Sequence, residues 1–182
     1  YESRFCNFDN EEWYASRKLD GVRCIVRKEG DTIKAFSRAG NEFTTLQKVL
    51  GDVAMMPGDF VLDGEICMMD ENGNEDFQGI MKQIKKKNHT IENPKFVIFD
   101  YLSLKEFDNK TSQMILSERL NELKGEIPHD GYYDYLTLLP QQLVNSEEEL
   151  LEMTAEAETN GYEGVMLRKN VGYEGKRSKN LL

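Results

Sequence analysis

The sequence predicts an α+β domain with largely antiparallel sheets flanked by helices. Short runs of branched and aromatic residues, typical of strands, alternate with stretches that have helical periodicity. Gly30-Asp31 lies between two such runs and has the composition of a hairpin turn. The chain has 182 residues, which is enough for one domain with a hydrophobic core or for two very small ones.

Strands and helices are expected in turn along the whole chain. The strand-like runs cover residues 23–28, 32–36, 61–68, 96–102, 135–139 and 164–168. Helical patterns cover residues 44–53, 76–87 and 113–123, and a fourth follows Ser146. In that fourth helix Ser146 and Glu149 have the spacing of a capping box, and Asn160-Gly161 supplies the stop signal.

Charge is distributed unevenly along the chain. The net charge of −10 by itself argues against nucleic-acid binding, which usually requires a basic surface, and acidic residues gather in 147–158. Basic residues cluster in 82–87 and 176–179, so any contact with DNA is expected to be local and weak unless neighbouring domains contribute. No apolar run approaches membrane-spanning length and no signal peptide is visible, so an intracellular protein without a membrane partner is expected.

Several common site types lack their usual residues. There is no Gly-x-Gly-x-x-Gly and no Gly-x-x-x-x-Gly-Lys-Ser/Thr, which disfavours a Rossmann or P-loop site. The two histidines lie in polar, loop-like stretches, so a zinc site or a Ser-His triad has little to build on. The three cysteines, Cys6, Cys24 and Cys67, are widely spaced and are expected to be free thiols.

The most informative run is Arg17-Lys18-Leu19-Asp20-Gly21-Val22-Arg23. Apolar residues on both sides predict a strand, a tight turn and a second strand, with Lys18 at the edge of the turn. A lysine held there could act as a nucleophilic amine, and Arg23 could hold a phosphate nearby. The same residues also fit an ordinary hairpin with two solvated cations.

Two further segments combine charge with strand patterns. Arg38 follows a strand in Ser-Arg-Ala-Gly-Asn, where a guanidinium could contact a phosphate or a ribose, or could simply be exposed. Asp63 and Glu65 interrupt the apolar strand 61–68 and share one face of it, because strand side chains alternate. Buried carboxylates need partners, so the pair could serve ribose hydroxyls, an ammonium group or a metal, or form a structural ion pair.

Two strand ends complete the set of candidates. Phe99 lies near the end of the apolar run Phe-Val-Ile-Phe-Asp-Tyr, where it is either a core residue or a platform for a base. Glu163 and Arg168 lie at the two ends of the apolar run 164–168. A carboxylate at a strand mouth suits a hard cation such as magnesium, although a turn glutamate would look the same.

Taken in order, these segments resemble the signature motifs of the nucleotidyltransferase domain of ATP-dependent DNA ligases, an ATP-grasp-like fold. Lys-Leu-Asp-Gly-Val-Arg is similar to motif I, Ser-Arg-Ala-Gly to motif Ia and Leu-Asp-Gly-Glu-Ile to motif III. Phe-Val-Ile-Phe-Asp-Tyr resembles motif IIIa, and Glu-Gly-Val-Met-Leu-Arg resembles motif IV. The resemblance spans residues 13–179 and includes the ligases of bacteriophages.

The resemblance implies a role for each motif residue. Lys18 would attack the α-phosphorus of ATP, form lysyl-AMP and release pyrophosphate. Arg23 and Arg38 would contact the nucleotide and a DNA 5′-phosphate, and Glu65 would touch the ribose. Phe99 would stack on adenine, and Glu163 would help to bind Mg²⁺ or Mn²⁺. AMP would then pass to the 5′-phosphate of nicked double-stranded DNA, in replication, repair or recombination, through a protein that acts as a monomer.

Two departures from the family pattern are visible. Ser16 stands where many members have an acid two residues before the nucleophile. The resemblance implies one domain over residues 1–182 that ends before motif V, with the phosphate-binding lysines beyond Leu182 and the OB-fold domain absent. Lys176 and Lys179 are therefore not assigned to motif V. On this view nick sealing needs more than these residues, and self-adenylylation by them would be feeble.

Three alternatives remain open at this point. An RNA ligase or RNA capping enzyme shares the lysyl-nucleotide step, although Arg23 and Ser-Arg-Ala-Gly favour DNA. An NAD-dependent ligase would carry an additional N-terminal domain that has no counterpart in this sequence. A non-enzymatic acidic interaction domain fits the net charge but leaves the pair Asp63 and Glu65 without a purpose.

Overall fold

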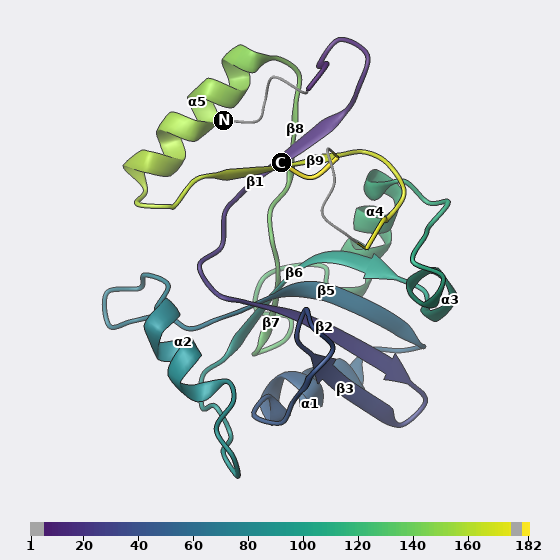
Figure 1. The fold of residues 1–182 in the computed structure, drawn as a ribbon, viewed down its shortest axis with the longest axis vertical. Coiled ribbons are helices and arrows are strands. Elements are labelled where there is room, and N and C mark those ends of the chain that lie inside the picture. The colour runs from purple at the N-terminus through teal and green to yellow at the C-terminus, as the bar shows by residue number, and fades with distance from the viewer. Residues whose placement is uncertain (1–5, 176–179) are drawn as a thin grey trace.

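The computed structural model describes residues 6–175 and 180–182, and its strands form two sheets (Figure 1). The smaller sheet has the order β8-β1-β9, formed by Gln142–Val144, Trp13–Arg17 and Val165–Lys169. The larger has the order β4-β3-β2-β5-β6-β7, formed by Glu42–Phe43, Thr32–Phe36, Val22–Glu29, Phe60–Cys67, Lys95–Leu102 and Leu136–Leu138. The helices are α1 (Gln47–Met55), α2 (Phe77–Gln83), α3 (Leu104–Asp108), α4 (Leu116–Glu126) and α5 (Glu147–Thr159).

The predicted α+β class with largely antiparallel sheets is confirmed. Among the described strands, every neighbouring pair is antiparallel except β6 and β7. All six predicted strands are present, and Gly30-Asp31 is the two-residue turn between β2 and β3, with Gly30 at φ +59°. The short strands β4 and β8 and the five-residue helix α3 are not among the predicted elements, because so few residues give no clear periodicity. Strand β7 is as short as β8, but it lies within the longer apolar run 135–139.

Helix boundaries differ from the sequence prediction by a few residues. Helix α1 begins at Gln47 rather than at residue 44, and α4 runs from Leu116 to Glu126 rather than over 113–123. Helix α2 ends at Gln83, so residues 85–87 lie in the turn that follows it. The amide of Lys86 donates to the carbonyl of Gln83, and Asn88 has φ +51°, a conformation that does not continue a right-handed helix.

The two faces of the larger sheet have different roles. One face carries apolar side chains such as Cys24, Leu62 and Ile98, which form one core cluster together with residues of α1, α2 and α4. The opposite face carries Arg23, Asp63, Glu65 and Phe99, because side chains alternate along a strand. The charged face is turned toward the smaller sheet, which lies above the larger one in Figure 1.

A β-bulge alters this alternation at the centre of the larger sheet. Asp63 is opposite Asp100 and Gly64 is opposite Ile98, so Phe99 is the extra residue in β6. The bulge places the consecutive side chains of Phe99 and Asp100 on the charged face, where both line a cavity. The strands approach closely here, since a Cβ on Gly64 would lie 2.2 Å from the carbonyl oxygen of Val97.

The predicted strand, turn and strand around Lys18 are present, but the strands do not form a hairpin. Strand β1 belongs to the smaller sheet and β2 to the larger, so residues 18–21 cross between the two sheets. The crossing is tight at Gly21, where a Cβ would lie 2.4 Å from the carbonyl oxygen of Ile66. The hairpin with two solvated cations is therefore wrong, because the partners of β1 are β8 and β9.

Two other expectations concern the core and the membrane. Helix α5 begins after Ser146, as the sequence predicts, and the side chain of Ser146 accepts from the amide of Glu149. The helix buries Leu150 and Ala157. Cys24 and Cys67 are buried and free, and Cys6 is free and partly buried. Within residues 6–175 and 180–182, no helix combines the length and the apolar character needed to cross a bilayer.

A buried ion pair joins α4 to β6. The guanidinium of Arg119 donates to both carboxylate oxygens of Asp100 at 2.8 and 3.1 Å, and both side chains are 4% exposed. Arg119 also donates to the carbonyl oxygens of Met114 and Val171. Removing the guanidinium would leave a buried carboxylate without its counter-charge.

We therefore expect Arg119→Ala to lower the free energy of unfolding by about 3–5 kcal/mol, measured by denaturant titration. Lys124→Ala is the matched control, because Lys124 lies on the same helix and is exposed. We expect the control to change stability by less than about 0.5 kcal/mol. Equal losses in the two variants would contradict a structural role for the ion pair.

Candidate functional site

All six site residues predicted from the sequence line one cavity. It has a volume of about 500 Å³ and lies where the smaller sheet faces the larger one. The predicted residues are Lys18, Arg23, Arg38, Glu65, Phe99 and Glu163. They come from the β1–β2 crossing, from β2, β5 and β6, from the loop after β3 and from the loop before β9.

Lys18 and Glu163 form an ion pair at the mouth of this cavity. Lys18 Nζ lies 3.2 Å from Glu163 Oε1, and the side chains are 48% and 56% exposed. The backbone supports the pair, because the amide of Lys18 donates to the carbonyl of Gly164 at 2.8 Å. The β1–β9 pairing thus brings together two residues from opposite ends of the chain.

Glu75 secures the segment that carries Lys18. One carboxylate oxygen of Glu75 accepts from the guanidinium of Arg17, and the other accepts from the amide of Asp20. Arg17 also lies over the ring of Tyr162, 5.0 Å from its centroid. Glu75 is not recognisable as a site residue from the sequence, because it lies in a polar loop 58 residues from Arg17 and outside every motif named above.

The two acids of β5 have different environments. Asp63 is 1% exposed, accepts from Arg23 Nε at 2.5 Å and also accepts from the hydroxyl of Tyr173 at 3.2 Å. Asp63 therefore forms a structural ion pair with Arg23, which is one of the alternatives that the sequence leaves open. Glu65 lines the cavity, and its buried Oε2 has no hydrogen-bond partner among the described residues. Burial raises the pKa of Glu65, against the lowering effect of the charge on Arg23.

Phe99 lies between two guanidinium groups. The Cζ atom of Arg168 is 3.8 Å from the ring centroid and that of Arg23 is 5.3 Å away, while Phe99 itself is 5% exposed. Burial lowers the pKa of Arg168, and its Nε is buried with no hydrogen-bond partner among the described residues. The sequence placed Arg168 only at a strand end, so its contact with Phe99 was not foreseen.

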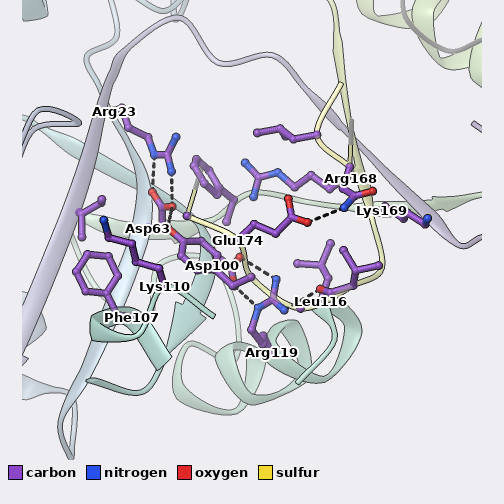
Figure 2. Close-up of a pocket in the computed structure, with 18 of the residues that line it drawn as sticks. Arg23, Asp63, Asp100, Phe107, Lys110, Leu116, Arg119, Arg168, Lys169 and Glu174 are labelled. Atoms are coloured by element: carbon purple, nitrogen blue, oxygen red, sulfur yellow. Dashed lines mark hydrogen bonds and ion pairs between the residues drawn. The ribbon is translucent and has the colours of Figure 1, made fainter. Parts of the chain in front are cut away.

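A second cavity, of about 540 Å³, adjoins the first (Figure 2). The two share lining residues, among them Arg23, Arg38, Phe99 and Arg168. Figure 2 shows the Arg23–Asp63 and Arg119–Asp100 ion pairs on the wall of the second cavity. Arg23 therefore lies at the border between the two cavities, and Asp63 lines only the second.

The metal prediction rests on Glu163 alone. In the described part of the chain, no three His, Cys, Asp or Glu side chains gather in a group that could hold a metal ion. Mg²⁺ commonly takes one or two carboxylates and completes its shell with water and substrate phosphates. The exposed carboxylate of Glu163 fits that type of site.

The basic run 176–179, which includes Lys176 and Lys179, lies outside the described residues.

The arrangement suits a phosphate-bearing ligand. Arg23 and Arg38 supply guanidinium groups to the cavity, and Glu65 supplies an acceptor oxygen that no described residue satisfies. Lys18 supplies an accessible primary amine with a carboxylate beside it.

Comparisons with known proteins agree with these features. The family model for the ATP-dependent DNA ligase domain matches residues 1–182. The SPbeta prophage-derived DNA ligase-like protein LigB of Bacillus subtilis is 29% identical over 184 residues, covering 96% of this chain and 62% of that protein. DNA ligase 2 of Methanosarcina mazei is 28% identical over 181 residues, covering 94% of this chain and 31% of that protein. The chain thus spans less than two thirds of either relative.

Solved structures have the same fold. Pmar-Lig_Pre matches with a TM-score of 0.83 and 26% identity over 94% of this chain and 42% of that chain. The ATP-dependent DNA ligase of bacteriophage T7, in complex with ATP, matches with a TM-score of 0.71 and 17% identity. That match covers 98% of this chain and 63% of the bacteriophage protein, and at this identity it supports the fold alone.

The environment of Glu65 predicts a pH-dependent effect on stability. Because burial raises its pKa in the folded state, the ionised carboxylate lowers stability once the pH exceeds the pKa of an unfolded glutamate. We expect Glu65→Gln to be more stable than the parent near pH 7.5, and the difference to shrink as the pH falls below the pKa of an unfolded glutamate, about 4.3, where both states of the parent become protonated. Denaturant titration across this pH range measures this.

The control is Glu71→Gln, which changes an exposed glutamate in the loop before α2. We expect this control to show no such gain across the same pH range. A loss of stability in Glu65→Gln near pH 7.5 would mean that hydrogen-bond donors hold the carboxylate in its ionised form.

Proposed function

The chain belongs to the ATP-dependent DNA ligase domain family, and we propose that it forms the adenylation domain of such a ligase. The observation that carries the proposal is the single cavity that holds all six motif residues, with Lys18 paired to Glu163. A cavity of about 500 Å³ is within the range of small-molecule sites. An acidic interaction domain would give these converging groups no role.

Lys18 is the proposed nucleophile. Its Nζ would attack the α-phosphorus of ATP, so that an N–P bond forms, the bond to the bridging oxygen breaks and pyrophosphate leaves. The attacking amine must give up a proton, which would pass to solvent, while the carboxylate of Glu163, 3.2 Å away, would hold the amine in position. The product is AMP joined to Lys18.

The other cavity residues would bind and orient the nucleotide. Arg23 and Arg38 would offset phosphate charge, and Arg38 would also meet the DNA 5′-phosphate. The Oε2 of Glu65, which has no hydrogen-bond partner in the part of the chain that the structure describes, would accept a hydrogen bond from a ribose hydroxyl. Phe99 would stack on adenine, either through the part of the ring that Arg168 leaves open or after that guanidinium moves aside.

Glu163 is the proposed protein ligand of Mg²⁺ or Mn²⁺. The exposed position of this carboxylate fits a cation that is shared with substrate phosphates. Such a cation would offset the charge that develops on the phosphates during transfer. In the subsequent steps AMP would pass to the 5′-phosphate of nicked duplex DNA, and the adjacent 3′-hydroxyl would displace it and seal the strand.

We expect Lys18→Ala to abolish covalent labelling of the protein by ATP labelled on the α-phosphate, in the presence of Mg²⁺. Lys18→Arg should also fail, because a guanidinium keeps the positive charge but is a poor nucleophile. Lys34→Ala is the control, since Lys34 is exposed on β3 and does not line the cavity. Label that persists in Lys18→Ala would remove Lys18 from its assigned role.

Glu75→Gln tests whether the segment that carries Lys18 must be held in place. We expect the rate of lysyl-AMP formation to fall about 10- to 100-fold, because small displacements of a reacting group cost rates of this order. The exposed Glu71, four residues earlier in the same loop, provides the control variant Glu71→Gln.

A double-mutant cycle locates the effect of Glu75. If Glu75 acts through Arg17, the effects of Glu75→Gln and Arg17→Ala should be clearly less than additive. Full additivity, or a normal rate in Glu75→Gln, would show that the contact does not position Lys18.

A further inference from the structure

Helix α2 and the turn after it carry a cluster of exposed lysines to which the proposed function gives no role. Lys82 on the helix and Lys85, Lys86 and Lys87 in the turn are all exposed. Within the described residues, none of the four lies within salt-bridge distance of a carboxylate. Four unpaired cations in six residues stand out in a protein with a net charge of −10. We call these four residues the lysine surface.

The backbone beneath the lysine surface is held firmly. Ile80, Ile84 and Ile91 are buried in the main core on either side of the turn. The hydroxyl of Thr45 donates to the carbonyl of Ile84 at 2.8 Å, and Gln83 contacts the ring of His89 at 2.9 Å. The turn therefore presents its lysines at set positions, and a partner would have to order only the side chains.

The lysine surface is linked structurally to the Lys18 cavity. Glu75, which contacts Arg17 and Asp20, lies next to Asp76, the N-cap residue of α2. Helix α2 has seven residues and is therefore roughly 10 Å long. The lysines at its C-terminal end thus begin roughly 10 Å from the N-cap residue Asp76. This corresponds to about three base pairs of duplex DNA at 3.4 Å each.

The distribution of charge along the molecule would orient a polyanion toward this end. Helix α5 carries exposed acids at Glu147, Glu148, Glu152, Glu156 and Glu158. Figure 1 shows α5 at the top of the molecule and α2 at the lower left, separated along its longest axis. A DNA backbone would be repelled by α5 and attracted by the lysine surface.

We propose that the lysine surface binds the sugar-phosphate backbone of duplex DNA beside the nick. This inference rests on the proposed function, because it takes nicked DNA as the substrate of the Lys18 site. The contacts are electrostatic and do not depend on base sequence. They position the duplex and contribute nothing to the attack on ATP, since none of the four lysines lines the cavity.

The test compares two triple variants with equal changes in charge. The first is Lys85→Gln with Lys86→Gln and Lys87→Gln, which removes three cations from the lysine surface. The control is Lys34→Gln with Lys105→Gln and Lys124→Gln, three exposed lysines on β3, α3 and α4. The measurements are lysyl-AMP formation from ATP without DNA, and binding of a nicked duplex between about 50 and 200 mM salt.

We expect the first variant to form lysyl-AMP at the parent rate and to bind nicked DNA at least about tenfold more weakly near 0.1 M salt. Its slope of log affinity against log salt should fall by about 2–3, because each lost phosphate contact removes about 0.9. The control should keep both the affinity and the slope of the parent.

Each contrary result has one meaning. Equal losses of DNA affinity in the two variants would show a general charge effect and would overturn the proposal. Unchanged DNA affinity in the first variant would also overturn the proposal, and is expected if the lysines are only solvated or bind an acidic protein. A parent protein that binds no nicked DNA at 50 mM salt would overturn it as well. Failure of the parent to form lysyl-AMP would count against the proposed function instead, and the binding experiment would still be informative.

Discussion

The pairing of Arg23 with Asp63 is the interaction on which the charged face of the larger sheet depends. Asp63 is almost completely buried in the middle of β5, where an ionised carboxylate without a partner would be very costly. Arg23 on β2 supplies the counter-charge, and Tyr173 adds a hydrogen bond from the segment after β9. One buried charge thus joins two central strands to a distant part of the chain, and it directs the guanidinium of Arg23 to the border between the two cavities.

The bulge at Phe99 makes a second contribution to the same face. A regular β6 would alternate between core and cavity, so Phe99 and Asp100 could not both point to one side. The extra residue allows Phe99 to line both cavities while Asp100 binds Arg119 of α4. At Gly64, opposite the bulge, there is no room for a side chain, because the backbone of β6 approaches too closely. Local irregularity in the backbone therefore creates the site without disturbing the core on the other face.

Overall charge is a poor guide to this protein. The chain is acidic, yet Arg23, Arg38 and Arg168 converge on one cavity. Helix α2, which precedes the lysine turn, lies away from the acidic helix α5 in Figure 1. Field strength at a site depends on the nearest charges and on their burial rather than on the sum over the chain. An acidic protein can therefore present a strongly cationic site to a phosphate-bearing ligand.

The amino-acid sequence by itself determined the class of fold, six of the strands and six of the residues that line the first cavity. The strands depend on a short-range pattern, because side chains alternate along a strand. The six site residues were identified by short motifs whose order along the chain resembles that of a known family. Only the tertiary structure decided that β1 and β2 belong to different sheets, that Asp63 is paired while Glu65 is open, and that Glu75 secures the Lys18 segment. Those outcomes depend on strand register, on a bulge and on burial, which bring together residues that are far apart in the chain, and no local pattern encodes such distances.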